Sequence, residues 1–176
     1  MPNDRLADLV HYVIWRSDPA RLGATKLAKI CWYSDIASQR WLGKTISGAT
    51  HYKRLQHGPV PKNLHHVIEE LQWRGLIAVA KETYFDRPKT MYMAKTFPAI
   101  DHFTSHEIAI IDRIAEAICD NHTAVSISQL SHDGLWEEIE IGADIPVAAA
   151  AVIPGEITVE DLKWAAGAVD ANRPAT

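Results

Sequence analysis

The sequence predicts a mainly helical protein that forms one domain, a helical bundle with a small β-hairpin. The length of 176 residues suits one domain with a sizeable core. Apolar residues recur at helical spacing over most of the chain, whereas residues 76–94 have the character of two short strands joined by a turn. We assign residues 1–170 to the domain and residues 171–176 to a flexible tail.

Two helices are predicted at the start of the chain. The first has an apolar face made of Leu6, Leu9, Val10, Val13 and Ile14, and residues 17–19 stop it because Pro19 cannot extend a helix. The second should run from near Thr25 to about Leu42, with Gly43 as its C-terminal stop. This second helix has apolar residues on two sides, so we expect it to be central.

A third helix and a hairpin should follow. Pro61 is expected in the first turn of the helix, where its missing N–H costs nothing. The core-facing stripe comprises Leu64, Val67, Ile68 and Leu71, and Gly75 should end the helix. A strand over residues 76–85, a turn at residues 86–88 and a returning strand over residues 89–94 then predict a hairpin that resembles a wing.

The C-terminal third is expected to be helical. Thr104 and Glu107 form a capping box for a helix whose buried stripe comprises Ile108, Ile111, Ile114, Ala115 and Ile118. Short helices should begin near Ser126 and after Asp133. Residues 146–153 are equally compatible with an extended segment and a helical turn. A last helix is expected to begin at residue 158.

Composition indicates a reduced, cytoplasmic protein. No apolar run approaches the roughly 20 residues that cross a bilayer, and the N-terminus lacks the pattern of a signal peptide. The two cysteines have no metal or disulfide spacing. Residues 40–95 hold ten Lys and Arg against four Asp and Glu, whereas residues 96–176 hold three against fourteen, so an acidic half could steer a basic partner.

Catalytic and metal-binding patterns are absent from the sequence. His106 and Glu107 open an HExxH pattern, but residue 110 is Ile, so the second metal ligand is missing. No GxSxG or phosphate-binding glycine loop occurs. We therefore predict no enzymatic activity, no catalytic or metal residues and no cofactor.

The most distinctive stretch is a stiff corner at residues 57–61. Gly58 permits a turn that a side chain would obstruct, and the flanking prolines restrict the backbone. The corner could be simply a rigid connector. Our hypothesis is that it presents a preorganised surface to a protein partner, with contact residues Tyr52, Lys53, Arg54, His57, Gly58, Pro59 and Val60.

A winged-helix DNA-binding protein is the alternative. The third helix would read the DNA and the basic hairpin would be the wing. However, this helix also exposes Glu69 and Glu70, which phosphates repel, and the isoelectric point is about 6.1. Nucleic acid is therefore not the expected partner.

Several motifs together resemble a known family. They are Lys26-Leu27-x-Lys29-Ile30-x-Trp32-Tyr33-x-Asp35, Gly43-x-x-Ile46-x-Gly48, Tyr52, His57-Gly58-Pro59-Val60, Glu107, Leu130-Ser131-His132 and Trp136. This pattern, spread over a region from Leu6 to Val152, resembles the Panacea domain of SocA-like antitoxins. Ala28 and Ala37 depart from it, because the family tends to carry larger side chains there.

The resemblance implies an antitoxin of a bacterial or prophage toxin–antitoxin pair. Such proteins are mostly helical with a small β element and neutralise toxins, generally by direct protein binding. The resemblance also allows an adaptor that delivers the toxin to a cellular protease, and family members occur among phage-associated proteins. We therefore expect a cognate toxin as partner, and a winged-helix regulator remains the second hypothesis.

Overall fold

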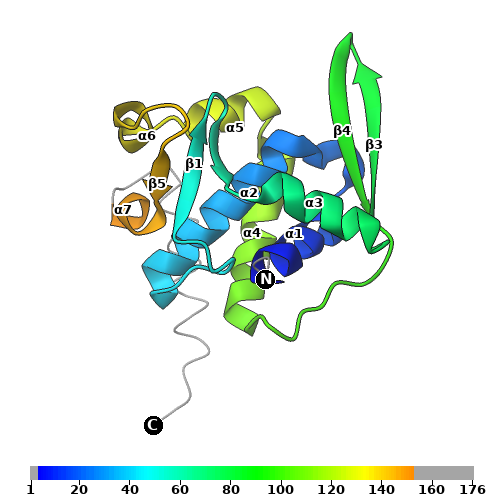
Figure 1. Ribbon diagram of the computed structural model, residues 1–176, viewed down its shortest axis with the longest axis horizontal. Coiled ribbons are helices and arrows are strands. Elements are labelled where there is room, and N and C mark those ends of the chain that lie inside the picture. The colour runs from blue at the N-terminus through cyan, green and yellow to red at the C-terminus, as the bar shows by residue number, and fades with distance from the viewer. Residues whose placement is uncertain (1–3, 153–176) are drawn as a thin grey trace.

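The computed structural model describes residues 4–152, and the helices and strands in this part surround one long helix, α2 (Figure 1). The helix expected from residue 158 and the expected tail lie outside the described residues. Within residues 4–152, no helix is both long and apolar enough to cross a lipid bilayer.

The first two helices are α1 (Asp4–Arg16) and α2 (Pro19–Leu42). Asp18 caps α2 by accepting a hydrogen bond from the backbone N–H of Ala20 at 2.8 Å, so the first turn begins earlier than predicted. Gly23 then interrupts the helix with φ 65° and ψ 167°, and the predicted start near Thr25 falls just after this kink. Gly43 ends α2 in the left-handed conformation at φ 71°, as predicted.

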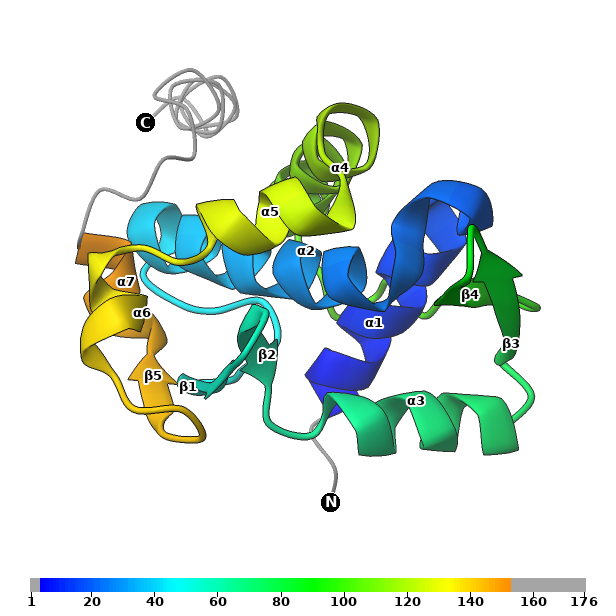
Figure 2. The same cartoon turned by 90° about the horizontal axis from the view of Figure 1, so that it is seen from above.

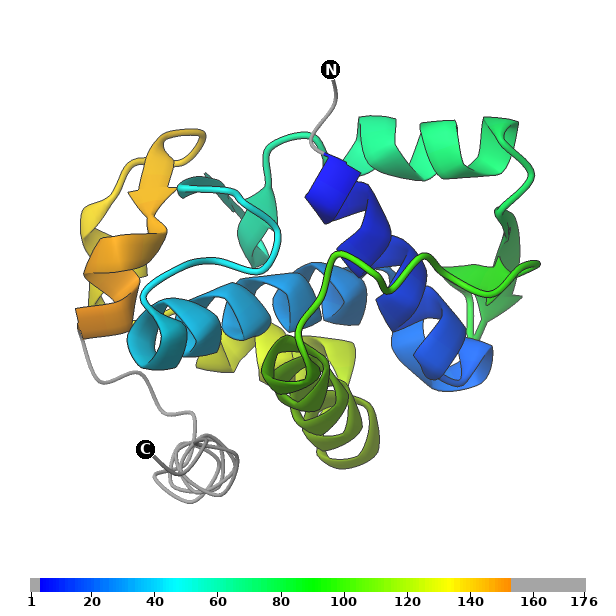
Figure 3. The same cartoon turned by 90° about the horizontal axis from the view of Figure 1, so that it is seen from below.

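The central position expected for α2 is confirmed. It contacts α1, α4, α5, α7, β2 and β4, and all of its residues from Lys26 to Ser38 are buried. Figure 2 shows α5 lying along one side of α2, and Figure 3 shows α1 and α4 from the opposite side. A helix packed on several flanks must bury even its polar residues, which has consequences for Lys29 and Asp35.

The predicted corner is a second β element. Strands β1 (His51–Leu55) and β2 (Gly58–Pro61) form an antiparallel hairpin, and β5 (Asp144–Pro146) pairs with the other edge of β1. Pro61 lies opposite Tyr52 in the sheet, so its predicted place in the first turn of a helix is wrong. An edge strand tolerates proline because an outward-facing N–H is not needed for pairing. Helix α3 (Leu64–Trp73) begins only after this strand.

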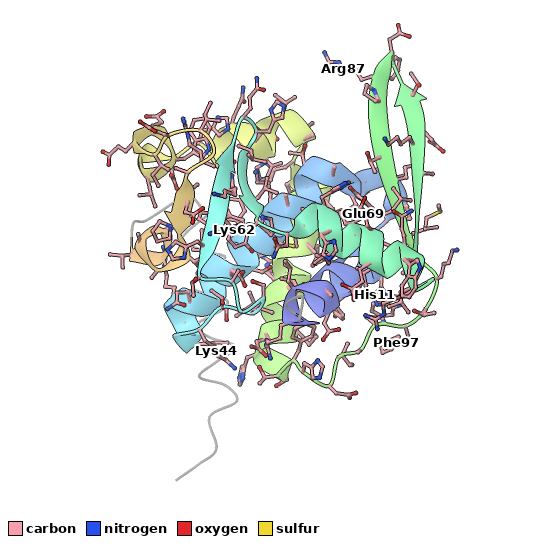
Figure 4. All side chains as sticks on the ribbon, viewed as in Figure 1. His11, Lys44, Lys62, Glu69, Arg87 and Phe97 are labelled. Carbon is pink, nitrogen blue, oxygen red and sulfur yellow. The ribbon has the colours of Figure 1, made fainter. Side chains whose placement is uncertain are left out.

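The predicted hairpin is present as β3 (Ile77–Tyr84) and β4 (Arg87–Ala94). Its turn is made by Phe85 and Asp86, whose φ angles are 45° and 59°, rather than by residues 86–88. Two left-handed residues match the twist of the paired strands, which explains the earlier turn. Pro88 lies within β4, opposite Thr83. The hairpin stands out from the helices, with Arg87 near its far end (Figure 4).

The remaining helices are α4 (Ser105–Asn121), α5 (Ala124–Leu130), α6 (Gly134–Glu138) and α7 (Val147–Val152). The capping box of Thr104 and Glu107 and the cap at Asp133 are confirmed. In α4, Ile110 is buried and Ile108 is only partly buried, because the stripe is centred closer to Ile111 than predicted. The sequence left residues 146–153 open between an extended segment and a helical turn. In the structure Pro146 is the last residue of β5, and the residues from Val147 to Val152 form α7. The described chain is mainly helical with small antiparallel strands, as predicted.

Candidate functional site

A buried polar cluster connects α2 to the hairpin β1–β2. The carboxylate of Asp35 accepts hydrogen bonds from the backbone N–H of Ser47 at 2.9 Å, from the Ser47 hydroxyl and from the Tyr52 hydroxyl at 2.8 Å. All three residues are fully buried. The ring of Tyr52 also packs edge-on against Trp32, with centroids 5.0 Å apart. This cluster therefore sets the position of β1 over the central helix.

Burial strongly perturbs the two acidic groups of the cluster. It raises the pKa of Asp35 above the usual 3.8, although the hydrogen bonds from Ser47 and Tyr52 oppose that shift. Burial, together with the nearby charge of Asp35, raises the pKa of Tyr52 well above 10.0. The phenol therefore keeps its proton and remains a hydrogen-bond donor to Asp35 at physiological pH.

The loop that carries Ser47 is held from its other side by Arg5. The guanidinium donates to the carbonyl oxygens of Ile46 at 2.8 Å and His102 at 2.7 Å, and it pairs with Glu107 at 2.9 Å. The Glu107 side chain is fully buried. These contacts join α1, the loop after α2 and the start of α4, and they limit movement of the Asp35 cluster.

A second buried group supports the start of β2. Lys29 is only 1% exposed, and its Nζ donates to the carbonyl oxygen of Pro59 at 2.9 Å. A Cβ on Gly58 would lie 2.6 Å from Nζ of Lys29 and closer still to Oγ of Ser131. Gly58, at φ 100°, is thus required both by its conformation and by this close approach. Ser128 of α5 completes the support by donating to the carbonyl oxygen of His57 at 3.0 Å.

Burial lowers the pKa of Lys29 from 10.5 to about 7, so the folded protein should become more stable as the pH rises above 7. In that range the unfolded chain keeps the proton that the folded state has lost. The free energy of unfolding should therefore increase by about 1.5 kcal/mol between pH 7 and 8.5. Lys29→Met should remove this rise, measured by urea unfolding at several pH values. An equal rise in both proteins would contradict the assignment.

The outer side of the hairpin carries a stack of three side chains. The guanidinium carbon of Arg54 lies 3.9 Å from the ring centroid of Trp136, and this ring stacks on His132 with centroids 3.7 Å apart and planes 10° apart. Arg54 and His132 form no ion pair with any carboxylate in the described part of the chain. Cation–π contact holds Arg54 in a defined plane. Leu55, Gln56 and His57 are exposed beside it.

We call the group of Arg54, Leu55, Gln56, His57, His132 and Trp136 the tip surface. The guanidinium of Arg54 gives it positive charge, whereas burial and the neighbouring charges of Lys29, Arg54 and His57 lower the pKa of His132 below 6.5, which favours its neutral ring. It also contains an apolar component, since the Leu55 side chain is 43% exposed. The tip surface can thus offer a protein partner both apolar contact area and the Arg54 guanidinium in a fixed orientation. Its residues are not arranged as a catalytic group.

The predicted contact residues divide into three groups. At the tip surface His57 is exposed and Arg54 is partly buried, and Lys53 and Val60 are also partly buried. Tyr52, Gly58 and Pro59 are buried, so the structure contradicts the expectation that they form part of an exposed contact surface. The Tyr52 hydroxyl instead donates a hydrogen bond to Asp35 in the buried polar cluster. Lys53 is engaged with Asp144 at 2.7 Å, and this bond, with that from Lys62, lowers the pKa of Asp144 to about 2.

The described residues contain no cluster that could hold a metal ion, and Cys31 is shielded from solvent. Among residues 4–152, no three His, Cys, Asp or Glu side chains gather closely enough to hold a metal ion. Cys31 is fully buried, and burial raises the pKa of its thiol far above 9.0, which disfavours the reactive thiolate.

Comparison with protein families gives a match that covers most of the chain. The family described as "Antitoxin SocA-like, Panacea domain" matches residues 27–137, which is more than half of the chain. The chain belongs to this family. The Panacea-domain match is narrower than the region from Leu6 to Val152 over which the sequence resembles the family. Comparison with curated proteins and with solved structures gave no match.

The Panacea-domain match contains both buried clusters and the tip surface. It begins within α2 just before Lys29 and ends in α6 just after Trp136. Lys29, Asp35, Ser131, His132 and Trp136 occur in the motifs that resemble the family, yet sequence reasoning did not select them as site residues. A signal was available, because lysine and aspartate on a helix that is apolar on two sides must find buried partners.

Proposed function

We propose that this Panacea-domain protein is a non-enzymatic antitoxin that neutralises a cognate protein toxin by direct binding at the tip surface. The observation that carries the proposal is Arg54, held on Trp136 beside exposed Leu55 and His57. Arginine and tryptophan are among the residues that most often dominate protein interfaces. Family membership supports the antitoxin role.

The support beneath the tip favours tight binding. Lys29 and Ser128 hold the backbone at Pro59 and His57, and the Asp35 cluster holds β1. A surface that is already ordered loses little conformational entropy on association, so more of the contact energy appears as affinity. Tyr52, Gly58 and Pro59 enter this proposal as supports rather than as contacts.

The first test is co-expression with the product of the adjacent reading frame. We expect that product to arrest growth alone and to become harmless when this protein is present. Arg54→Ala and His57→Ala should each weaken toxin binding about tenfold or more, because each removes a contact at the tip. Isothermal titration calorimetry with purified toxin measures this change, and circular dichroism checks the fold.

Arg87→Ala is the matched control, because it removes an exposed arginine at the end of the other hairpin (Figure 4). It should leave toxin affinity unchanged. Equal weakening by Arg87→Ala and Arg54→Ala would argue for diffuse charge attraction. A harmless neighbouring gene product would remove the basis of the antitoxin proposal.

Within this proposal, delivery of the toxin to a cellular protease is the alternative to simple occlusion. The two differ in the fate of the toxin, because an adaptor shortens its half-life and an occluding antitoxin does not. Measuring the decay of labelled toxin with and without this protein separates the two mechanisms.

We also propose that the gene for this protein lies in a prophage or bacterial toxin–antitoxin operon and that the protein is cytoplasmic. The free thiols of Cys31 and Cys119 support a reducing compartment.

The second candidate function is DNA binding in the manner of a winged helix, by which the protein would regulate its own operon. The observation in its favour is the hairpin β3–β4, which follows α3 directly in the chain. Against it, α3 exposes Glu69, which pairs with His65 at 3.2 Å (Figure 4). A gel shift with upstream DNA tests it, since phosphate-driven binding should weaken steeply with salt.

A further inference from the structure

A cavity of about 700 Å³ lies on the described chain, away from the tip surface. Three segments line it: residues 20–26 of α2, residues 88–90 of β4, and residues 122–125 where α4 passes into α5. Figures 1 and 2 show β4 standing beside the N-terminal part of α2. Sites for small molecules in proteins typically have volumes of about 300–1,000 Å³, so the cavity is large enough for one.

The kink in α2 shapes one wall of this cavity. Gly23 has φ 65° and ψ 167°, which separates the first turn of α2 from the long segment that follows. The space beside Gly23 is open, since a Cβ added there would meet nothing within 4 Å. The interruption therefore leaves a hollow that an uninterrupted helix would not provide.

The lining of the cavity is positively charged. It includes Arg21, Lys26, Lys89 and His122, and none of its fourteen residues is Asp or Glu. The Lys26 side chain is buried, and its ammonium donates to the carbonyl oxygen of Cys119 at 3.3 Å. In the described chain Lys26 has no ion pair with a carboxylate. The lysine is thus buried among like charges.

Arg21, Lys26 and Lys89 bring three like charges to the lining of the cavity. Arg21 pairs with Asp120 at 2.7 Å, and that carboxylate is not part of the lining. Lys89 donates to the carbonyl oxygen of Ala20. Burial lowers the pKa of Lys26, and the charges of Lys89 and Arg21 act in the same direction, whereas the charge of Asp120 acts against them. An anion among the three cations would relieve this repulsion.

We propose that this cavity binds a small organic phosphate, with Lys26 and Lys89 contacting the phosphate group. A multiply charged head suits several converging cations better than a single carboxylate does. The rest of the lining suits an organic body, because Leu22, Pro88 and Val125 provide apolar surface and Thr25, Thr90 and Thr123 provide hydroxyls. This proposal is independent of toxin binding, since no lining residue belongs to the tip surface.

The test is calorimetric titration of the full-length protein with ADP, inorganic pyrophosphate and citrate. We expect ADP and pyrophosphate to bind and citrate to bind more weakly. Lys26→Met and Lys89→Met should each weaken ADP binding about tenfold, because each removes a charge that contacts the phosphate. Lys81→Met, which alters an exposed lysine of β3 outside the lining, should leave it unchanged.

Because Lys26 is buried, thermal unfolding must show that Lys26→Met still folds. If it does not fold, the more exposed Lys89→Met variant decides the result alone. No binding of ADP or pyrophosphate, or equal binding by the Lys89→Met variant and the unaltered protein, would overturn the proposal. Citrate binding as tight as that of ADP would exclude a phosphate-selective site, and equal weakening by Lys81→Met would show unspecific attraction.

Discussion

Replacing Gly58 by alanine should destabilise the protein by about 3 kcal/mol, since both the backbone and the packing oppose a side chain there. The φ of 100° lies in a region that alanine rarely adopts. The new methyl group would also meet Nζ of Lys29 at 2.6 Å and Oγ of Ser131 still more closely. Relief requires the Lys29 and Ser131 side chains to shift, and each is held by a buried hydrogen bond. Urea unfolding followed by circular dichroism measures the loss.

Gly142→Ala is the control that separates the two causes. Gly142 has φ 85°, but a Cβ there would meet nothing within 4 Å. This variant should therefore cost only about 1 kcal/mol, the backbone part of the effect. Placing Gly58→Ala in a Ser131→Ala background should recover part of the loss, because one of the two clashing groups is gone. Equal costs for Gly58→Ala and Gly142→Ala would contradict the close approach.

Replacing Asp35 by alanine should cost roughly 3 kcal/mol, because it leaves buried donors without an acceptor. The Ser47 N–H and the Tyr52 hydroxyl both donate to this carboxylate, and both residues are fully buried. The relief of an unfavourably buried carboxylate offsets part of this cost. The loss should appear as a lower urea midpoint with an unchanged dependence on denaturant.

Tyr52→Phe is the matched control for the Asp35 cluster. It removes one donor and leaves the carboxylate with both hydrogen bonds from Ser47, so it should cost only about 1 kcal/mol. If Asp35→Ala cost no more than Tyr52→Phe, the cluster would not hold β1 in place. Because β1 carries Arg54, we also expect Asp35→Ala to weaken toxin binding although Asp35 lies beneath the surface.

The elements that could be predicted from the sequence are those specified by neighbouring residues. The apolar stripes of α1, α3 and α4 could be predicted from helical spacing. The capping box at Thr104 and the helix end at Gly43 could be predicted because the residues involved lie within one helical turn of each other. The hairpin β3–β4 was predicted for the same reason, although the predicted turn began one residue too late.

The β1–β2 hairpin was missed because its local pattern is weak. Its strands are short, include two prolines, and do not alternate cleanly between apolar and polar residues. β1 is completed by β5, about ninety residues later in the chain, and this pairing leaves no local signal. As a result the sequence suggested an irregular corner, and Tyr52 was expected at the surface.

By itself, the sequence determined the mainly helical class, the central helix and the family, because periodicity and short motifs are local properties. Only the tertiary structure decided which of the corner residues face solvent. Lys29 and Asp35 lie on α2, far in the sequence from Ser131 at the end of α5, and they become supports of the hairpin only when α2 and α5 pack against it. A buried polar group must find partners wherever the fold provides them, and those partners cannot be read from its neighbours in the sequence.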